Sequence, residues 1–323
     1  MIGILRRNPF ALIAMLLVSG ALLWMMAHSV TAKPGLLFWI GVLLLWAAVW
    51  IGNDALSGLA APSPLSLRVR NLAVPVIFGL TVLLLWQLAV KGLGISPVFL
   101  PAPSDIWVRF TTSFATLKAD FIQTFLRAVL AGWAIGSLAG FLVAILCDAW
   151  GFLRRGLLPL GNLFAALPIV GVAPIMVMWF GFDWQSKAAV VTIMTFFPML
   201  VNAVTGLQAS GHLERDLMRS YGASYLDTLI KLRLPAAMPF IFNALKINST
   251  LALIGAIVAE FFGTPIVGMG FRISTEVARF SLDMVWAEIA VAAIAGSAFY
   301  GLIALVERAV TFWHPSYRSQ KGQ

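Results

Sequence analysis

Long apolar stretches alternate with short polar segments along the chain. Eight of these stretches hold about 20 mostly apolar residues, the length that an α-helix needs to cross a bilayer. None of them alternates apolar and polar positions over about ten residues, as the strands of a membrane barrel do. Because backbone amides find no other partner in lipid, each stretch is predicted to be a helix. The predicted spans are 10–28, 35–51, 71–90, 124–147, 158–180, 187–207, 236–260 and 286–308.

The composition points to the same class of protein. Hydrophobic residues make up 61% of the 323 residues, charged residues only 11%, and the mean hydropathy is +0.94. A soluble domain carries about 25% charged residues. The net charge of +9 does not indicate binding of nucleic acid, because the basic residues stand singly or in pairs at the ends of apolar stretches. The sequence therefore predicts an all-α, polytopic helical bundle in a lipid bilayer.

The distribution of basic residues predicts the orientation of the chain. With the N-terminus in the cytoplasm, the cytoplasmic segments hold thirteen lysines and arginines, and the outer segments hold seven. This excess follows the positive-inside rule, so both termini are expected in the cytoplasm. Arg6 and Arg7, followed by an apolar stretch that ends at Ala32, also fit a cleavable signal peptide. The stretch is long for a signal peptide, and we therefore expect an uncleaved first helix.

A segment at 61–70 divides the chain. Together with the residues just before it, this segment is rich in proline, serine and glycine, and it is predicted to be a linker. It separates a two-helix N-terminal membrane extension at 1–60 from a six-helix core at 71–315. A cytoplasmic tail follows at 316–323. The sequence carries no internal repeat of the kind that builds inverted-topology secondary transporters.

The longest predicted cytoplasmic loop, at about 208–235, carries a helical pattern. Apolar residues recur at intervals of four and share one face of a helix, while charged residues occupy the other face. Gly222 interrupts the pattern midway, which favours a turn between two short helices. Pro235 begins the next span, where its missing N–H is harmless. The apolar positions are Leu217, Tyr221, Tyr225 and Leu229, and the charged positions are Glu214, Arg215, Asp216, Arg219 and Asp227.

Periodicity alone leaves two interpretations of this loop open. One is a helix that lies on the lipid headgroups, and the other is a surface that docks onto a partner. The spacing resembles the EAA loop of ABC importer permeases, which reads Glu-Ala-Ala, three residues, Gly, nine residues, then Ile, any residue and Leu-Pro. Three positions are identical to that pattern, namely Gly222, Leu234 and Pro235. Leu232 is a conservative replacement for the isoleucine of the pattern.

The resemblance implies a role for this segment. In ABC importer permeases the EAA loop forms coupling helices that sit in a groove of the ATP-hydrolysing subunit. Asp216 keeps the acidic charge at the start of the motif, whereas Leu217 and Met218 are bulkier than the alanines of the family. Arg219 and Ala223 fall within the same docking segment.

Other segments are similar to permeases of the nitrate, sulfonate and taurine importer group. Together they cover about 71–315, and they lie at 99–107, 166–191, 196–207, 257–271 and 307–315. The resemblance implies a type I ABC importer transmembrane core of six helices in a bacterial inner membrane, to which this chain adds two N-terminal helices. It further implies three kinds of partner: ABC ATPase subunits at the cytoplasmic face, a substrate-binding protein outside, and a second permease copy that completes a homodimer.

The chain carries no motif for chemistry of its own. The phosphate-binding string Gly, four residues, Gly-Lys-Ser/Thr does not occur in it, so ATP and Mg are expected on the partner ATPase. The chain itself is expected to be non-catalytic and without a bound cofactor. Its single cysteine, Cys147, cannot form a disulfide within the chain, and its histidines lack the spacing of metal ligands: His28, His212 and His314.

Four polar residues of the span 236–260 are candidates for the translocation path. Asn243, Lys246 and Thr250 share one helix face, and charge within a bilayer is costly enough to suggest function. Lys246 either lines the path and attracts an anionic or polar substrate, or extends its ammonium group to the cytoplasmic interface. Glu260 at the outer end is either solvated or orders a gate by pairing with one of two arginines, Arg272 or Arg279.

These features predict the permease subunit of an ATP-driven, binding-protein-dependent importer. The resemblance favours a small polar or anionic solute such as nitrate, a sulfonate or taurine. The same machine importing a vitamin precursor, such as a pyrimidine or riboflavin, is the alternative within this class. An ion-coupled secondary transporter is the alternative from another class, but it requires carboxylates at mid-membrane, and the acidic residues here stand mainly at the ends of spans.

Overall fold

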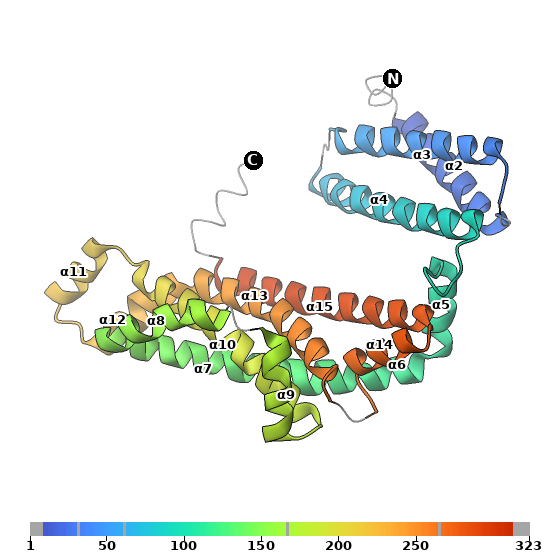
Figure 1. The fold of residues 1–323 in the computed structure, drawn as a ribbon. Coiled ribbons are helices and arrows are strands. Elements are labelled where there is room, and N and C mark those ends of the chain that lie inside the picture. Colours follow the sequence, from blue (N-terminus) through green and yellow to red (C-terminus); the bar gives the residue numbers. More distant parts are fainter. Residues whose placement is uncertain (1–8, 31–32, 61–62, 166–167, 264–265, 313–323) are drawn as a thin grey trace. The chain divides into compact units, whose positions relative to one another are not determined.

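A computed structural model describes residues 9–30, 33–60, 63–165, 168–263 and 266–312, and the regular elements among them are helices (Figure 1). Seven helices in this part of the chain are long and apolar enough to cross a membrane. The prediction of an all-α membrane bundle is therefore confirmed. Two predicted features lie outside the described residues, namely the cleavage position after Ala32 and the cytoplasmic tail at 316–323.

The predicted span at 158–180 does not form one helix. α8 (Gly151–Ala165) ends before Pro168, which is the N-cap of α9 (Ile169–Phe180). Proline lacks a backbone N–H and disfavours helical geometry in the residue before it, so a helix tends to end at such a position. The 12 residues of α9 extend for about 18 Å, which is less than the apolar thickness of a bilayer.

The helices form two compact units. The first contains the described residues up to Thr112 together with Phe280–Trp286, and the second contains Ser113–Arg279 and the described residues from Ala287 onward. This division differs from the boundary predicted at 61–70. Residues 64–70 form the first turns of α4 (Pro64–Leu93), because the Ser63 side chain accepts a hydrogen bond from the Ser66 N–H and caps the helix.

The first unit is built on three long helices, α2 (Pro9–Ser29), α3 (Leu36–Ser57) and α4. Their buried contact consists of Leu23, Ala27, Val42, Val49 and Leu88. Ion pairs attach the shorter α5 (Pro103–Thr112). Lys91 lies 2.8 Å from Asp105, and Arg109 lies 2.9 Å from Asp283 at the start of α15.

The second unit is organised around α10, which packs against α7 on one side and α13 on the other (Figure 1). Two stretches wound as π-helix, η1 and η2, precede α7 and α13. The elements of this unit, besides α8 and α9, are α6 (Phe114–Phe121), η1 (Ile122–Val129), α7 (Leu130–Ala149), α10 (Trp184–Gln208), α11 (His212–Ser220), α12 (Tyr225–Thr228), η2 (Leu229–Arg233), α13 (Leu234–Glu260), α14 (Met269–Ala278) and most of α15 (Leu282–Val310).

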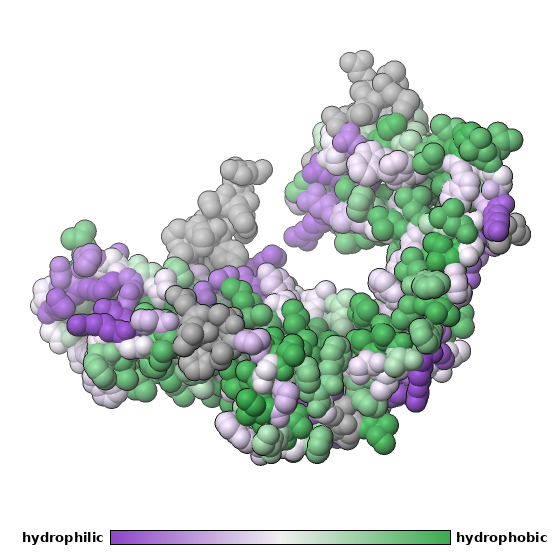
Figure 2. Space-filling model, in the orientation of Figure 1, coloured by the Kyte–Doolittle hydropathy of each residue, from purple (hydrophilic) through white to green (hydrophobic). Residues whose placement is uncertain are grey.

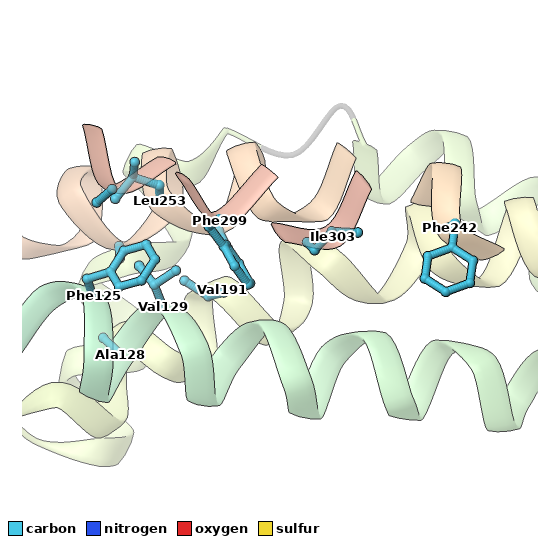
Figure 3. Packing of buried hydrophobic residues seen from close by; sticks show 11 residues of the cluster. Phe125, Ala128, Val129, Val191, Phe242, Leu253, Phe299 and Ile303 are labelled. Atoms are coloured by element: carbon cyan, nitrogen blue, oxygen red, sulfur yellow. The ribbon is translucent and has the colours of Figure 1, made fainter. Parts of the chain in front are cut away.

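One hydrophobic cluster joins four of these elements (Figure 3). The Phe299 ring of α15 meets the Phe125 ring of η1 edge-on, with 5.6 Å between the ring centres. Val191 of α10 and Leu253 of α13 close the cluster from the other helices. Helices in a bilayer associate through such packing, because lipid tails are as apolar as the side chains themselves.

A glycine seam (Gly132, Gly136 and Gly140) brings α7 against α10. These residues recur every fourth position, which is the small-xxx-small pattern of close helix pairs in membranes. No side chain larger than hydrogen fits there. A Cβ at the three positions would lie 2.5 Å from Val191 Cβ, 2.1 Å from Thr195 Oγ1 and 2.4 Å from the Phe196 carbonyl oxygen, respectively.

Elsewhere the long helices expose large apolar side chains, and Figure 2 shows hydrophobic residues over much of their surface. This is the pattern expected where helices face lipid. The exposed side chains are found in both units and include Leu17, Leu44, Leu72, Leu138, Ile294 and Leu305.

Candidate functional site

The loop predicted at 208–235 folds as the two short helices α11 and α12, with a turn at Gly222 between them, as the sequence indicated. The Ala223 N–H donates to the Met218 carbonyl at 3.0 Å, and the Gly222 N–H donates to the Arg219 carbonyl at 2.9 Å. These two bonds form a Schellman motif, which requires a left-handed residue at its centre. Gly222 has φ +69°, so glycine suits this position better than a residue with a Cβ.

α12 continues through η2 into α13 without interruption. The Ser224 side chain accepts from the Asp227 N–H and starts the helix. Pro235 lies near the start of α13, where its ring would clash with a carbonyl in a regular helix. The wider π-turn of η2 directly before Pro235 relieves this conflict. The loop is therefore joined to a membrane helix by one continuous helical rod.

Side chains also fasten the loop to α7 and α10. The Arg233 guanidinium pairs with the Asp148 carboxylate at the end of α7 and donates to the Leu207 carbonyl of α10 at 3.0 Å. The Tyr225 hydroxyl donates to the same carboxylate at 3.0 Å. Arg215 donates to the Gln208 carbonyl at 2.7 Å. Sequence reasoning missed the role of Asp148; its place at the cytoplasmic end of a predicted span was the available signal.

Several apolar side chains of the loop remain exposed. We call the set formed by Leu213, Leu217, Tyr221, Leu226 and Ile230 the docking patch; its members are 56% to 85% exposed. Figure 2 shows that hydrophilic residues surround α11, so the patch stands in a charged setting. Asp216 and Arg219 are also exposed and form only a loose pair at 3.7 Å.

The remaining residues of the predicted coupling segment lie closer to the bundle. Ala223, Leu232, Leu234 and Pro235 are half-buried. The structure therefore brings the predicted residues into one loop, but it divides them into an exposed part and a part that anchors the loop.

The candidates for the translocation path do share a face of α13. Asn243 and Thr250 are exposed, and Lys246 between them is half-buried. The Lys246 ammonium group lies 2.7 Å from a carboxylate oxygen of Glu307 on α15, so its charge is compensated within the bundle. Asn243 donates to the Asn202 side chain of α10 at 3.3 Å. A role of these residues in translocation stays a prediction.

The predicted pairing of Glu260 with Arg272 or Arg279 is wrong, and so is its solvation. Glu260 is 2% exposed, and its carboxylate accepts from the Thr124 hydroxyl at 2.7 Å and the Gly270 N–H at 2.6 Å. The free N–H groups at the start of α14 outcompete the arginines for this carboxylate. Arg279 pairs instead with Glu276 at 3.3 Å.

Arg272 pairs with Asp120 of α6 at 2.8 Å. Burial acts to lower the pKa of Arg272, but the hydrogen bond and the charge of Asp120 act against it, and the pKa is raised. Asp120 is fully buried and also accepts from the Gly268 N–H at 2.6 Å. This carboxylate thus holds both the start and the body of α14 to α6.

Glu288 of α15 lies near this pair and is fully buried. Neither of its carboxyl oxygens has a hydrogen-bond partner among the described residues. A carboxyl group that is buried in an apolar interior without a partner costs stability. No group of three histidine, cysteine, aspartate or glutamate residues in the described part of the chain is placed to hold a metal ion.

A bundle of membrane-crossing helices with an anchored helical loop at one end defines a polytopic membrane protein. Residues 136–318 match the family described as binding-protein-dependent transport system inner membrane component, and the chain belongs to this family. The matched residues include the loop and both helices to which it is fastened, from Gly136 of α7 onward. The resemblance to ABC importer permeases is confirmed, and the chain is an importer permease.

Three curated relatives match this chain over most of their own length. The formylaminopyrimidine transport permease protein ThiX of Halalkalibacterium halodurans is 28% identical over 74% of this chain and 95% of its own. The riboflavin transport system permease protein RibX of Chloroflexus aurantiacus is 28% identical over 72% and 87%. The taurine transport system permease protein TauC of Escherichia coli is 30% identical over 71% and 85%.

Proposed function

We propose that this permease is driven by separate ABC ATPase subunits that dock on the α11–α12 loop. The observation that carries the proposal is the docking patch, a set of exposed apolar side chains on a firmly anchored loop. Apolar side chains surrounded by a charged rim are typical of a protein interface. Closure of the ATPase pair pushes on this loop, and the continuous α12–η2–α13 rod carries the movement into the membrane.

The other parts of the machine follow from this arrangement. The loop and both termini lie in the cytoplasm of a bacterial cell, in keeping with the excess of basic residues in those segments. A substrate-binding protein delivers solute from the other side, and a second copy of the permease completes a homodimer. ATP and Mg are bound by the ATPase subunits, and the permease chain has neither a catalytic role nor a cofactor of its own.

The solute is proposed to be small and polar or anionic. The taurine relative favours a sulfonate-like solute, whereas the names of the other two relatives favour a vitamin precursor of the pyrimidine or riboflavin kind. Asn243, Lys246, Thr250 and Glu260 are retained as candidates for contact with the solute or for shaping its path.

The test is reconstitution of the permease with its ATPase and binding protein in liposomes. Leu217→Asp places a charge within the docking patch, and loss of such an interface residue costs about 2 kcal/mol, or roughly thirtyfold in affinity. We expect uptake and ATPase association to fall together. Leu305→Asp is unsuitable as a control, because it faces lipid; the exposed polar His212→Ala within α11 is the matched variant.

Uptake that proceeds on an ion gradient, in liposomes that lack the ATPase, would contradict the proposal and favour a secondary transporter. Unchanged ATPase association in Leu217→Asp would contradict the docking site alone.

A further inference from the structure

Arg127 is an exposed charge near the outer end of a membrane-crossing helix. It lies in η1, within the continuous membrane-crossing helix 114–149, and 13 residues after its start. It is the fourth residue of the span predicted at 124–147, so it lies near the outer end of the apolar stretch. Its side chain is exposed in the single chain. Because a charge facing lipid is costly, an arginine at this position is expected to face a watery or protein-lined space.

Such a space is present beside it. Arg127 lines an open cavity of ≈ 710 Å³, together with Gln123 of η1 and Asp183 at the start of α10. Ala119 and Phe182 belong to its apolar wall. The cavity lies toward the opposite end of α7 from the α11–α12 loop, since Asp148, which anchors that loop, is 21 residues further along the same helix. The adjoining helix is wound as π-helix, a geometry that recurs at functional sites.

The polar groups of the cavity are arranged in a chain. Asp183 Oδ1 accepts from the Gln123 amide nitrogen at 2.6 Å, which turns the Gln123 amide oxygen toward Arg127. That oxygen accepts from an Arg127 guanidinium nitrogen at 3.1 Å. A guanidinium has five N–H donors, and this is the one hydrogen bond that the described residues provide to it. Its fork of free donors matches the geometry of an oxyanion.

The carboxylate that lines this cavity, Asp183, is held by hydrogen bonds to other groups. Asp183 Oδ1 also accepts from the Trp184 N–H at 2.8 Å. Lys187, one turn further along α10, is buried, and its electrostatic partners are Asp183 and Glu260. Its ammonium group donates to the Phe182 carbonyl at 2.6 Å. Arg127 is thus the cation among the residues that line the cavity, and Asp183, which lines it too, accepts from the Gln123 amide and the Trp184 N–H.

We propose that Arg127 and Gln123 form an oxyanion-binding subsite of the solute pathway. The ligand is a small oxyanion, of the sulfonate, nitrate or bicarbonate type, held by the free guanidinium donors. Gln123 positions the guanidinium through the hydrogen bond that Asp183 orients. The proposal deepens the proposed function, on which it rests, by naming a contact residue and the chemical class of the solute.

Labelling of a cysteine in the cavity tests the proposal directly. The chain has a single cysteine, Cys147, which is fully buried, so the parent protein serves as the blank. Ala119→Cys places a thiol in the cavity wall, and the probes are methanethiosulfonates that carry a sulfonate or a trimethylammonium group. With Arg127 in place we expect the sulfonate reagent to react faster. We compare the labelling rate of the sulfonate reagent with that of the trimethylammonium reagent. Arg127→Gln should lower this ratio of rates about fivefold or more, since one full charge near the thiol is removed.

Two controls test whether the ratio of labelling rates reports on Arg127 and its ligand. Gln185→Cys lines a different, apolar cavity, so its ratio should not respond to Arg127→Gln. An excess of methanesulfonate should slow labelling of Ala119→Cys, whereas methylammonium should not. An unchanged ratio in Arg127→Gln would overturn the proposal, and so would a thiol at position 119 that neither aqueous reagent reaches.

Labelling needs no ATP, so its outcome is separate from that of the proposed function. In the reconstituted complex, Arg127→Gln is expected to reduce uptake of the anionic solute at least tenfold while the partner ATPase still hydrolyses ATP. If the wild-type complex shows no ATP-driven uptake, the proposed function fails while the labelling result stands.

Discussion

The pair formed by Asp148 and Arg233 is predicted to hold the coupling loop to the end of α7. The perturbation is Asp148→Ala, which removes the carboxylate that receives both Arg233 and the Tyr225 hydroxyl. The two charged side chains are only 2% and 13% exposed, so Arg233 would keep its charge in a poorly hydrated place. Among the described residues, its remaining hydrogen bond would be the one to the Leu207 carbonyl.

Breaking one half of a buried pair costs about 3–5 kcal/mol, because a charge is left uncompensated. A cost of about 3 kcal/mol shifts the equilibrium between anchored and detached loop by roughly a hundredfold. Arg233→Ala in addition to Asp148→Ala removes the stranded charge. The double variant should therefore lose less than the sum of the two single variants.

Hydrogen exchange followed by mass spectrometry measures the effect. We expect the amides of α11 and α12 to exchange roughly a hundredfold faster in Asp148→Ala, whereas those at the centre of α13 keep their rate. Asp216→Ala is the matched control, because its exposed pair with Arg219 contributes less than about 1 kcal/mol. Unchanged exchange in Asp148→Ala, or an equal effect of Asp216→Ala, would refute the anchoring role.

Three further predictions concern single positions. Gly222→Leu should lower uptake per ATP hydrolysed without preventing membrane insertion, because the φ of +69° at this position costs residues with a Cβ about 1–2 kcal/mol. Asparagine adopts this conformation more readily, so Gly222→Asn should lower uptake less, and equal uptake in the two variants would contradict the reasoning. Gly136→Leu should abolish the folded protein in a thermal-shift assay, since even a Cβ meets Thr195, whereas Gly79→Leu, with open space around it, should not. Glu288→Gln should keep the melting temperature, because an amide of nearly the same shape fills the same buried place; a large loss would show that the carboxyl group itself is needed there.

The sequence predicted the class of fold and the loop because both depend on local signals. A run of apolar residues long enough to cross lipid has few alternatives to a helix, and seven such helices are present among the described residues. Gly222 indicated the turn between α11 and α12 because a left-handed helix end calls for glycine. The division at Pro168 was missed because a count of apolar residues does not register a proline within the run.

The charge pairs could not be predicted, because they join residues that are distant along the chain. Lys246 meets Glu307 on another helix, and Asp120 meets Arg272, which is 152 residues away. Spacing within one helix tells which residues share a face, and Asn243, Lys246 and Thr250 do so. It does not tell which helix covers that face. Arg127 was missed for the same reason, since its cavity is completed by residues of α10.

The glycine seam restricts how this permease can move. Where two backbones touch, the helices cannot part without opening an empty gap, and they cannot slide without collision. α7 and α10 are therefore expected to move as one rigid pair, with Asp148 at one end and Arg127 near the other. Any change in the shape of this unit is then expected to occur where the rigid pair meets the helices around it.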